Sequence, residues 1–134
     1  MTPFSDPEIE YLAVQLLGRL ATVGPDGMPQ NNPVSFRYNA ELGTIDIGGH
    51  RMGATRKFRN VGATGKAAFV VDDVVSVSPW QVRCLEIRGT AEALHGQPPQ
   101  RPGFSPEIIR IRPRLVFSFG IDPAEPGMQR RNVG

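Results

Sequence analysis

Apolar residues near the start of the chain recur at the spacing of an α-helix. When the residues are placed at about 100° per position, one face carries Ile9, Leu12, Ala13, Leu16 and Leu17. Ser5 precedes this face and can cap the helix, and the acidic and proline residues after it suit a first turn. The pattern predicts an amphipathic helix that begins after Ser5 and ends at Gly18.

Most other apolar residues follow the two-residue period of β-strands. The alternation is clearest in residues 81–94, where Leu85 and Ile87 face one way and Glu86 and Arg88 face the other. The predicted strands span residues 19–23, 28–38, 44–48, 66–72, 81–94, 108–111 and 115–121, with a break at Pro113 between the last two. A second, short helix is predicted over residues 52–61.

The predicted strand at residues 28–38 combines an apolar face with two prolines. Val34 and Phe36 share one face, and Tyr38 continues it. Pro29 and Pro33 have no backbone N–H to donate to a neighbouring strand. We therefore expect this strand to lie at a sheet edge or to contain a bulge.

Other segments are distinguished by composition. Residues 66–72 contain a continuous apolar run, which predicts a strand buried on both faces. Residues 73–79 are predicted to be a connection, and residues 95–106, rich in Pro, Gly and Gln, a surface loop. Residues 122–134 show no period, so we expect an irregular C-terminal tail.

These elements predict a mainly β fold with two short helices, in a single domain over residues 1–134. Short turns between successive strands favour antiparallel pairing. A small closed or split barrel would leave no long, exposed sheet edge. The fold class expected is therefore an antiparallel β-barrel.

Composition and charge remove several classes of function. The sequence is 40% hydrophobic and 21% charged, as in ordinary globular proteins, and its net charge of +2 gives no support to nucleic-acid binding. Cys84 is the single cysteine, so we expect neither an internal disulfide nor a thiolate metal site. We also expect no signal peptide and no membrane span, and a location in the cytoplasm.

The most informative segment follows the predicted strand at 44–48. Two glycines, Gly48 and Gly49, lead into His50 and a short helix, and basic side chains stand at Arg51, Arg56, Lys57 and Arg59. Bare N–H groups at a helix start, together with cations, are suited to a phosphate, and Thr55 can add a hydroxyl. The alternative is a solvated basic face with glycines that serve only the turn.

Three amides interrupt the predicted edge strand. Gln30, Asn31 and Asn32 stand directly before Pro33. Amides both donate and accept hydrogen bonds, so they can read the edge of a heteroaromatic ring. The alternative is an edge strand made polar to prevent aggregation.

The order of several short motifs resembles one known family. These motifs are Leu20-Ala21-Thr22-Val23, Asp26-Gly27-x-Pro29, Pro33-Val34-x-Phe36, Lys57-x-x-Asn60-Val61 and Ile87-Arg88-Gly89-x-Ala91. Across about residues 8–121 the chain resembles the pyridoxamine 5′-phosphate oxidase-like split β-barrel family, which binds flavins. The run from Gly49 to Asn60 is similar to the branch that uses the deazaflavin coenzyme F420, including the OxyR-like reductases of antibiotic pathways.

The resemblance implies a homodimer of six-stranded antiparallel split barrels of the FMN-binding type, with two cofactor sites at the interface. It implies phosphate contacts from Arg51, Thr55, Arg56 and Lys57, beside Gly49, His50 and Asn60. It also implies that Asn31, Asn32, Pro33 and Val34 lie along the ring. Trp80 matches a position where family members often place an aromatic residue from the other subunit, although it can equally be a core or interface anchor.

The expected chemistry belongs to the cofactor. The first hypothesis is an F420-dependent reductase that transfers a hydride to an activated double bond of a small organic molecule. The alternatives are an FMN-dependent oxidoreductase, a non-catalytic cofactor carrier, and a barrel that binds haem or another ligand. No catalytic residue and no metal ligand stands out in the sequence, and the chain is too short for the substrate-binding part of true pyridoxamine 5′-phosphate oxidases.

Overall fold

The computed structural model describes residues 2–134, and its first element is α1 (Asp6–Val14). Ser5 caps this helix as expected: its hydroxyl accepts the Glu8 N–H at 3.3 Å, and the Glu8 carboxylate accepts the Ser5 N–H at 2.9 Å. The helix ends four residues before Gly18, so its predicted end is wrong. Gln15 is already extended, and Leu17 pairs with Ser35 of a strand, which competes with further helix.

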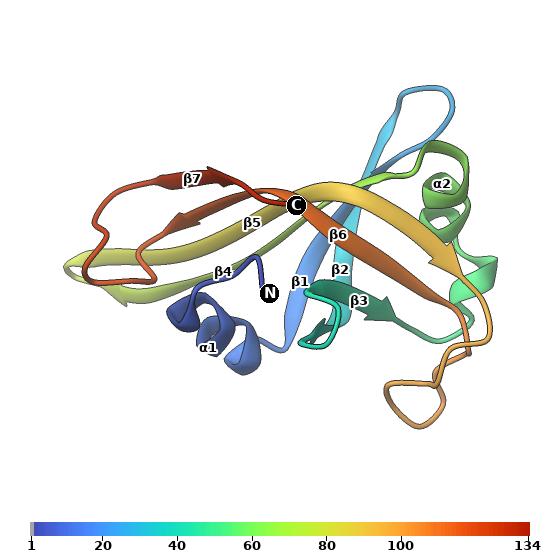
Figure 1. Cartoon of the computed structure of the whole chain (residues 1–134), viewed down its shortest axis with the longest axis horizontal. Coiled ribbons are helices and arrows are strands. Elements are labelled where there is room, and N and C mark those ends of the chain that lie inside the picture. The colour runs from blue at the N-terminus through green and yellow to red at the C-terminus, as the bar shows by residue number, and fades with distance from the viewer. Residues whose placement is uncertain (1) are drawn as a thin grey trace.

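Seven strands form one antiparallel sheet that closes on itself (Figure 1). They are β1 (Leu17–Val23), β2 (Pro29–Asn39), β3 (Thr44–Gly48), β4 (Lys66–Val77), β5 (Trp80–Leu94), β6 (Ile108–Phe119) and β7 (Gln129–Asn132). The sheet order is β3-β2-β1-β4-β5-β6-β7, and β3 also pairs with β6. Six strands therefore make a ring, which confirms the predicted antiparallel split-barrel fold.

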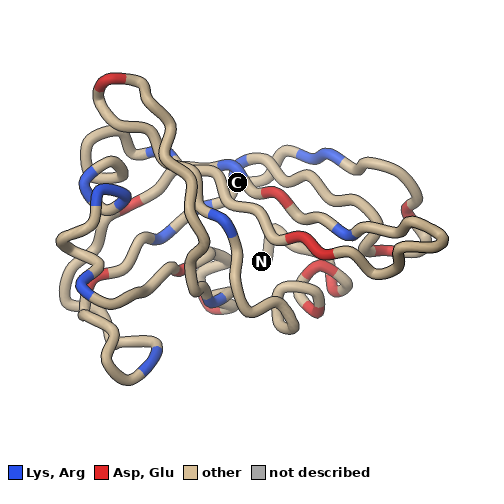
Figure 2. The backbone as a smooth tube through the Cα atoms, turned by 180° about the vertical axis from the view of Figure 1, so that it is seen from behind, with Lys and Arg blue, Asp and Glu red and all other residues tan. Residues whose placement is uncertain are grey.

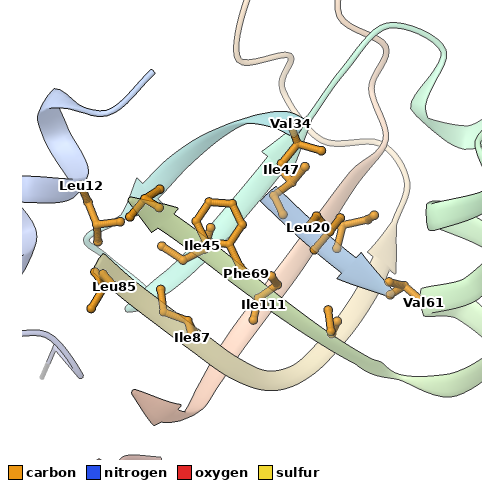
Figure 3. Close-up of a cluster of buried hydrophobic side chains, with 14 of the residues drawn as sticks. Leu12, Leu20, Val34, Ile45, Ile47, Val61, Phe69, Leu85, Ile87 and Ile111 are labelled. Carbon is orange, nitrogen blue, oxygen red and sulfur yellow. The ribbon is translucent and has the colours of Figure 1, made fainter. Parts of the chain in front are cut away.

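The core fills the inside of this ring (Figure 3). Inward residues from all six ring strands pack there, together with Leu12 of α1 and Val61. On β4 the burial alternates: Phe69 and Val71 are buried, whereas Val70 is only half-buried. The prediction of a strand buried on both faces is therefore wrong for the single chain, because the sheet has core on one side only.

The hairpin between β4 and β5 is longer than its sequence suggests. Residues 73–77, predicted to be a connection, continue β4 and pair with the start of β5. Tyr11 of α1 donates its hydroxyl proton to Asp73 at 2.8 Å, and Arg83 binds the same carboxylate at 3.0 and 2.6 Å. These contacts hold the hairpin against α1. The sequence predicted a connection here because Asp72 and Asp73 are polar and interrupt the apolar pattern of the strand.

Strand β6 passes through Pro113 without the predicted break. The irregularity appears instead as a register shift opposite, between Arg88 and Gly89 of β5. Arg88 faces Leu115 and Gly89 faces Pro113, so Arg114 is the extra residue of a bulge directly beside the proline, and bulges are places where a strand tolerates proline. Residues 108–119 are therefore one strand.

The predicted irregular tail, residues 122–134, contains β7 at its end. Gln129–Asn132 pairs with Leu115–Ser118 of β6. Arg131 forms an ion pair with the buried Glu8 and donates to the Pro3 carbonyl oxygen at 2.8 Å. The strand is held by backbone pairing and by this one arginine, so no apolar period marks it in the sequence.

Within residues 2–134, no helix is both long enough and apolar enough to cross a bilayer.

A buried ionic network joins β3 to β6, where the ring closes. Asp46 is fully buried and receives two hydrogen bonds from Arg110, both at 3.0 Å. Thr44 donates to the same carboxylate at 2.9 Å and Asn39 at 3.0 Å. Burial by itself raises the pKa of Asp46, but these donors outweigh it and hold the pKa below its usual 3.8.

We expect Asp46→Ala to destabilise the protein by about 3–5 kcal/mol, because the change leaves the half-buried Arg110 without its partner. Urea unfolding followed by circular dichroism measures this loss. Glu92→Ala is a matched control, since Glu92 of β5 pairs with Arg112 of β6 on the surface and its loss should cost at most about 1 kcal/mol. Equal losses for the two variants would contradict a special role for Asp46.

The same pair predicts an acid dependence of stability. Because folding lowers the pKa of Asp46, its contribution is complete above about pH 3.8 and is lost as the pH falls toward the folded-state pKa. Unfolding free energies measured between pH 6 and pH 2 should therefore fall more steeply for the natural protein than for Asp46→Ala. Parallel curves would contradict this assignment.

Candidate functional site

The basic segment identified in the sequence folds into two short helices. The turn η1 (Met52–Ala54) comes first, and α2 (Arg56–Thr64) follows it. Thr55 caps α2, since its hydroxyl accepts the Phe58 N–H at 3.3 Å and donates to the Met52 carbonyl oxygen at 2.7 Å. The α-helix therefore begins four residues later than predicted, and the Thr55 hydroxyl is already used by the fold.

The cations of this segment have no anionic partner. Among residues 2–134 there are seven ion pairs, and none includes Arg51, Arg56, Lys57 or Arg59. Figure 2 shows basic positions on the segment that contains α2, near the β1–β2 hairpin. Lys57 is half-buried, and this burial lowers the pKa of its ammonium below the usual 10.5. A bound anion would relieve that cost.

Arg51 has an unusual backbone conformation. Its φ of 51° lies in the left-handed region, and it is the one residue other than glycine within residues 2–134 that does so. A side chain with a Cβ pays roughly 1–2 kcal/mol there, and such residues concentrate at functional sites. The strain supports a functional role for this turn.

The glycines before Arg51 lie against the loop that precedes β6. A Cβ on Gly48 would lie 3.0 Å from the Phe104 ring, so Gly48 makes room for the loop at residues 95–107. Gly49 is half-buried, and its carbonyl oxygen accepts the Ser105 N–H at 3.0 Å. The loop therefore fills the space beside Gly48, whereas a Cβ on Gly49 would meet only Met52 Cε, at 3.6 Å.

His50 is exposed and is held by the same loop. Its Nδ1 lies 2.9 Å from the Gly103 carbonyl oxygen, and its ring packs edge-on against Phe104 at 5.0 Å. The loop also reaches the turn with Glu107, whose carboxylate accepts the Gly53 N–H at 3.1 Å. Glu107 was not found from the sequence, because its loop has no motif that points toward residue 53.

The amide strand lies next to α2. Residues 29–34 of β2 pair only with β1, because the pairing with β3 begins at Ser35, so this half of β2 is an edge as predicted. Asn31 and Pro33 are exposed on one face, and Asn32 and Val34 point to the other. The Asn32 Oδ1 is the one buried side-chain polar atom in residues 2–134 without a hydrogen-bond partner.

Asn60 connects α2 to this strand. Its side-chain nitrogen donates to Thr22 of β1 at 3.1 Å and to Gln30 of β2 at 3.4 Å, and the residue is buried. Lys57 stands three residues earlier, on the same side of the helix as Asn60. Asn60 therefore positions the basic helix against the amide strand.

Trp80 does not join these residues within one chain. It begins β5 at the far end of the β4–β5 hairpin, whereas α2 lies at the opposite end of the molecule (Figure 1). The structure thus brings Asn60 of α2 into contact with Thr22 and Gln30 and leaves Trp80 apart. Five cavities of about 200–660 Å³ are present elsewhere on the surface, and none of these five is lined by residues 29–34 or by α2.

The residues present fit a flavin-like cofactor. Unpaired cations at Arg51, Arg56 and Lys57 match a phosphate group. The unsatisfied Asn32 oxygen is a buried acceptor that a ring N–H could satisfy. A split barrel with a basic helix beside an edge strand that carries amides is typical of the flavin-binding split-barrel class.

The comparison with protein families agrees with that class. Residues 6–132 match the family model described as pyridoxamine 5′-phosphate oxidase. The chain belongs to this family, which confirms the predicted resemblance. It is also 51% identical over 133 residues to a 5a,11a-dehydrotetracycline/5a,11a-dehydrooxytetracycline reductase from Streptomyces rimosus, covering 98% of this chain and 94% of the relative. The predicted oxidoreductase class is confirmed.

Solved structures share the fold at low sequence identity. A haem-binding protein from Mycobacterium smegmatis matches with a TM-score of 0.69 and 16% identity, over 98% of this chain and 60% of that one. An FAD-binding protein from the same organism matches with a TM-score of 0.63 and 19% identity, over 96% and 98% of the two chains. A putative pyridoxamine 5′-phosphate oxidase from Listeria innocua matches with a TM-score of 0.64 and 18% identity, over 86% and 97%. The chain thus spans three fifths of the first of these structures.

We expect the Lys57 ammonium to titrate below pH 10.5 in the protein alone and to move upward when inorganic phosphate is added. The reason is that a nearby anion favours the charged form. Lys57 and Lys66 are the two lysines of the sequence, so NMR of lysine side chains resolves both, and the exposed Lys66 is an internal control. Identical responses of the two lysines to phosphate would argue against an anion site at α2.

Proposed function

We propose that this protein is a reductase that uses the deazaflavin coenzyme F420 and adds a hydride and a proton across an activated double bond of a fused-ring organic molecule. Two observations support the proposal: the unpaired cations at Arg51, Arg56 and Lys57, and the unsatisfied Asn32 oxygen on β2, two residues beyond the Gln30 that Asn60 of α2 contacts. FMN ends in a single phosphate. The deazaflavin has a phosphodiester and a glutamate tail, which give more anionic groups for these cations to meet.

The substrate class is supported by the 51%-identical relative, whose name describes the reduction of a tetracycline with a double bond between positions 5a and 11a. Because this identity extends over nearly the full length of both chains, we infer that the substrate of this protein is a related polycyclic acceptor. When bound, the reduced deazaflavin supplies the hydride. A separate dehydrogenase in the cytoplasm would regenerate it.

This chain's own residues would bind and orient the cofactor. Arg51, Arg56 and Lys57 would hold the phosphodiester by charge-assisted hydrogen bonds, and Asn60 would keep α2 against β2. The Asn32 oxygen would accept a ring N–H, which fixes the ring along the strand Asn31–Val34. No acid or base from the chain is required for these roles.

We further propose a homodimer in which the partner completes each cofactor site. Trp80 lies far from α2 in one chain, so a site that contains both needs two copies. The outward face of the ring carries apolar side chains at Leu17, Val70 and Phe117, two of them half-buried and Leu17 exposed. Light scattering of the purified protein should give twice the mass of the chain, and a monomer would contradict this arrangement.

Lys57→Ala should weaken binding of the deazaflavin tenfold to a hundredfold, since a charge-assisted hydrogen bond is worth about 1.5–3 kcal/mol. Fluorescence titration of the purified protein with oxidised coenzyme F420 measures the affinity. Lys66→Ala is the matched control, because Lys66 is exposed at the start of β4, and it should bind as tightly as the natural protein.

The same titration with FMN separates the alternatives. Tight binding of FMN without binding of the deazaflavin would replace this proposal with an FMN-dependent oxidoreductase. Binding of the deazaflavin without reduction of any polycyclic enone or quinone, tested with the reduced cofactor, would replace it with a cofactor carrier.

A further inference from the structure

A second ligand-sized region lies at the end of the molecule opposite α2. A cavity of about 660 Å³ lies there, lined by residues of the β4–β5 hairpin and of the segment at residues 119–126; Figure 1 shows this hairpin at the end of the molecule opposite α2. Its walls include Val75, Trp80, Val82, Phe119, Ile121 and Pro126. We name it the hairpin hollow. Its volume lies within the 300–1,000 Å³ that is usual for small-molecule sites.

The hairpin hollow exposes more apolar surface than the fold requires. Val75 is 52% exposed, Trp80 67% and Phe119 40%, although all three are large apolar residues. A contiguous apolar surface of this kind is characteristic of a binding site rather than of a free protein face. An indole adds a flat ring face, which stacks well on other flat ring systems.

The walls of the hollow are fixed by the fold. One wall of the hollow is the segment at residues 119–126. Gly120 in this segment has a φ of 70°, and a Cβ there would lie 2.3 Å from the Val82 carbonyl oxygen, so the segment begins in direct contact with β5. The other wall is the β4–β5 hairpin, which is held in place by the Arg83–Asp73 ion pair and by the hydrogen bond from Tyr11 to Asp73. The hollow is therefore formed before any ligand binds, which reduces the entropic cost of binding.

The charges around the hollow differ from those at α2. Its one cation, Arg83, is occupied by Asp73, and the other charged groups in its lining are the carboxylates of Asp122 and Glu125. A phosphate or a glutamate tail would be repelled here. The hollow suits a flat, largely apolar molecule without excess negative charge. Its carboxylates make it an unsuitable site for the anionic part of a cofactor.

We propose that the hairpin hollow binds the fused-ring acceptor of the reaction, with Trp80 as the surface on which its rings stack. This inference rests on the proposed function, which supplies the polycyclic substrate class. In the proposed homodimer, the hollow of one subunit presents the acceptor to the cofactor held by α2 and β2 of its partner. Val75 and Phe119 would then determine which ring systems are accepted.

Trp80 is the single tryptophan of the sequence, so intrinsic fluorescence reports on the hollow directly. The probe is oxytetracycline, a four-ring compound, titrated into the full-length protein both without cofactor and with saturating oxidised coenzyme F420. We expect saturable quenching of Trp80 in at least one of the two series. Absorption by the probe is corrected with free N-acetyltryptophanamide.

Val75→Ser should raise the dissociation constant of oxytetracycline about five- to tenfold, because it removes apolar wall from the hollow. The matched control is Val14→Ser, the same exchange at a residue that is 65% exposed at the end of α1 and does not line the hollow. This control should bind as the natural protein does. Both sites are exposed, so both variants should fold, which thermal unfolding verifies.

Several results would overturn the proposal. Quenching that does not saturate in either series, with deazaflavin binding still dependent on Lys57, would reject the hollow and leave the proposed function standing. Loss of both bindings would reject the two together. Weaker deazaflavin binding by Val75→Ser with unchanged oxytetracycline binding would assign the hollow to the cofactor, and a monomeric Val75→Ser would assign it to the subunit contact.

Discussion

The architecture of this protein depends on the closure of its sheet between β3 and β6. Ring closure requires β3, the short strand at one end of the sheet order, to pair with β6, and the Asp46–Arg110 pair lies at that seam. A carboxylate removed from water is tolerable only when its oxygens are satisfied, and here Thr44 and Asn39 complete the set of donors. Because β3 leads directly into the basic turn, the position of the seam also fixes where α2 begins.

Much of the ring could be predicted from periodicity because its strands have core on one side. The alternation of Leu85 and Ile87 with charged neighbours, and the face shared by Val34 and Phe36, both marked the inside correctly. The predictions failed where partners distant in sequence decide the conformation. The polar residues after Val71 form a strand because they pair with β5. The terminal strand β7 has no apolar pattern and is stabilised by the ion pair of Arg131 with Glu8.

The candidate site shows the same division. The cations and the amides were visible as residue types, and the fold does bring Lys57, Asn60 and the amide strand together. The roles of Thr55 and Gly48 were not visible, because the capping hydrogen bond and the packing of Phe104 depend on three-dimensional neighbours. Asn32 was predicted as one amide among three, and only its burial without a partner distinguishes it.

The strand β7 ties the two ends of the chain to each other. Arg131 reaches Glu8 and Pro3, and residues 2–3 and 133–134 line one common cavity. Ends that lie this close can be joined by a short peptide, and new ends can be opened in a surface loop such as residues 95–106. The protein is therefore a suitable scaffold for circular permutation, in which the order of the elements along the chain changes while the ring of strands stays the same.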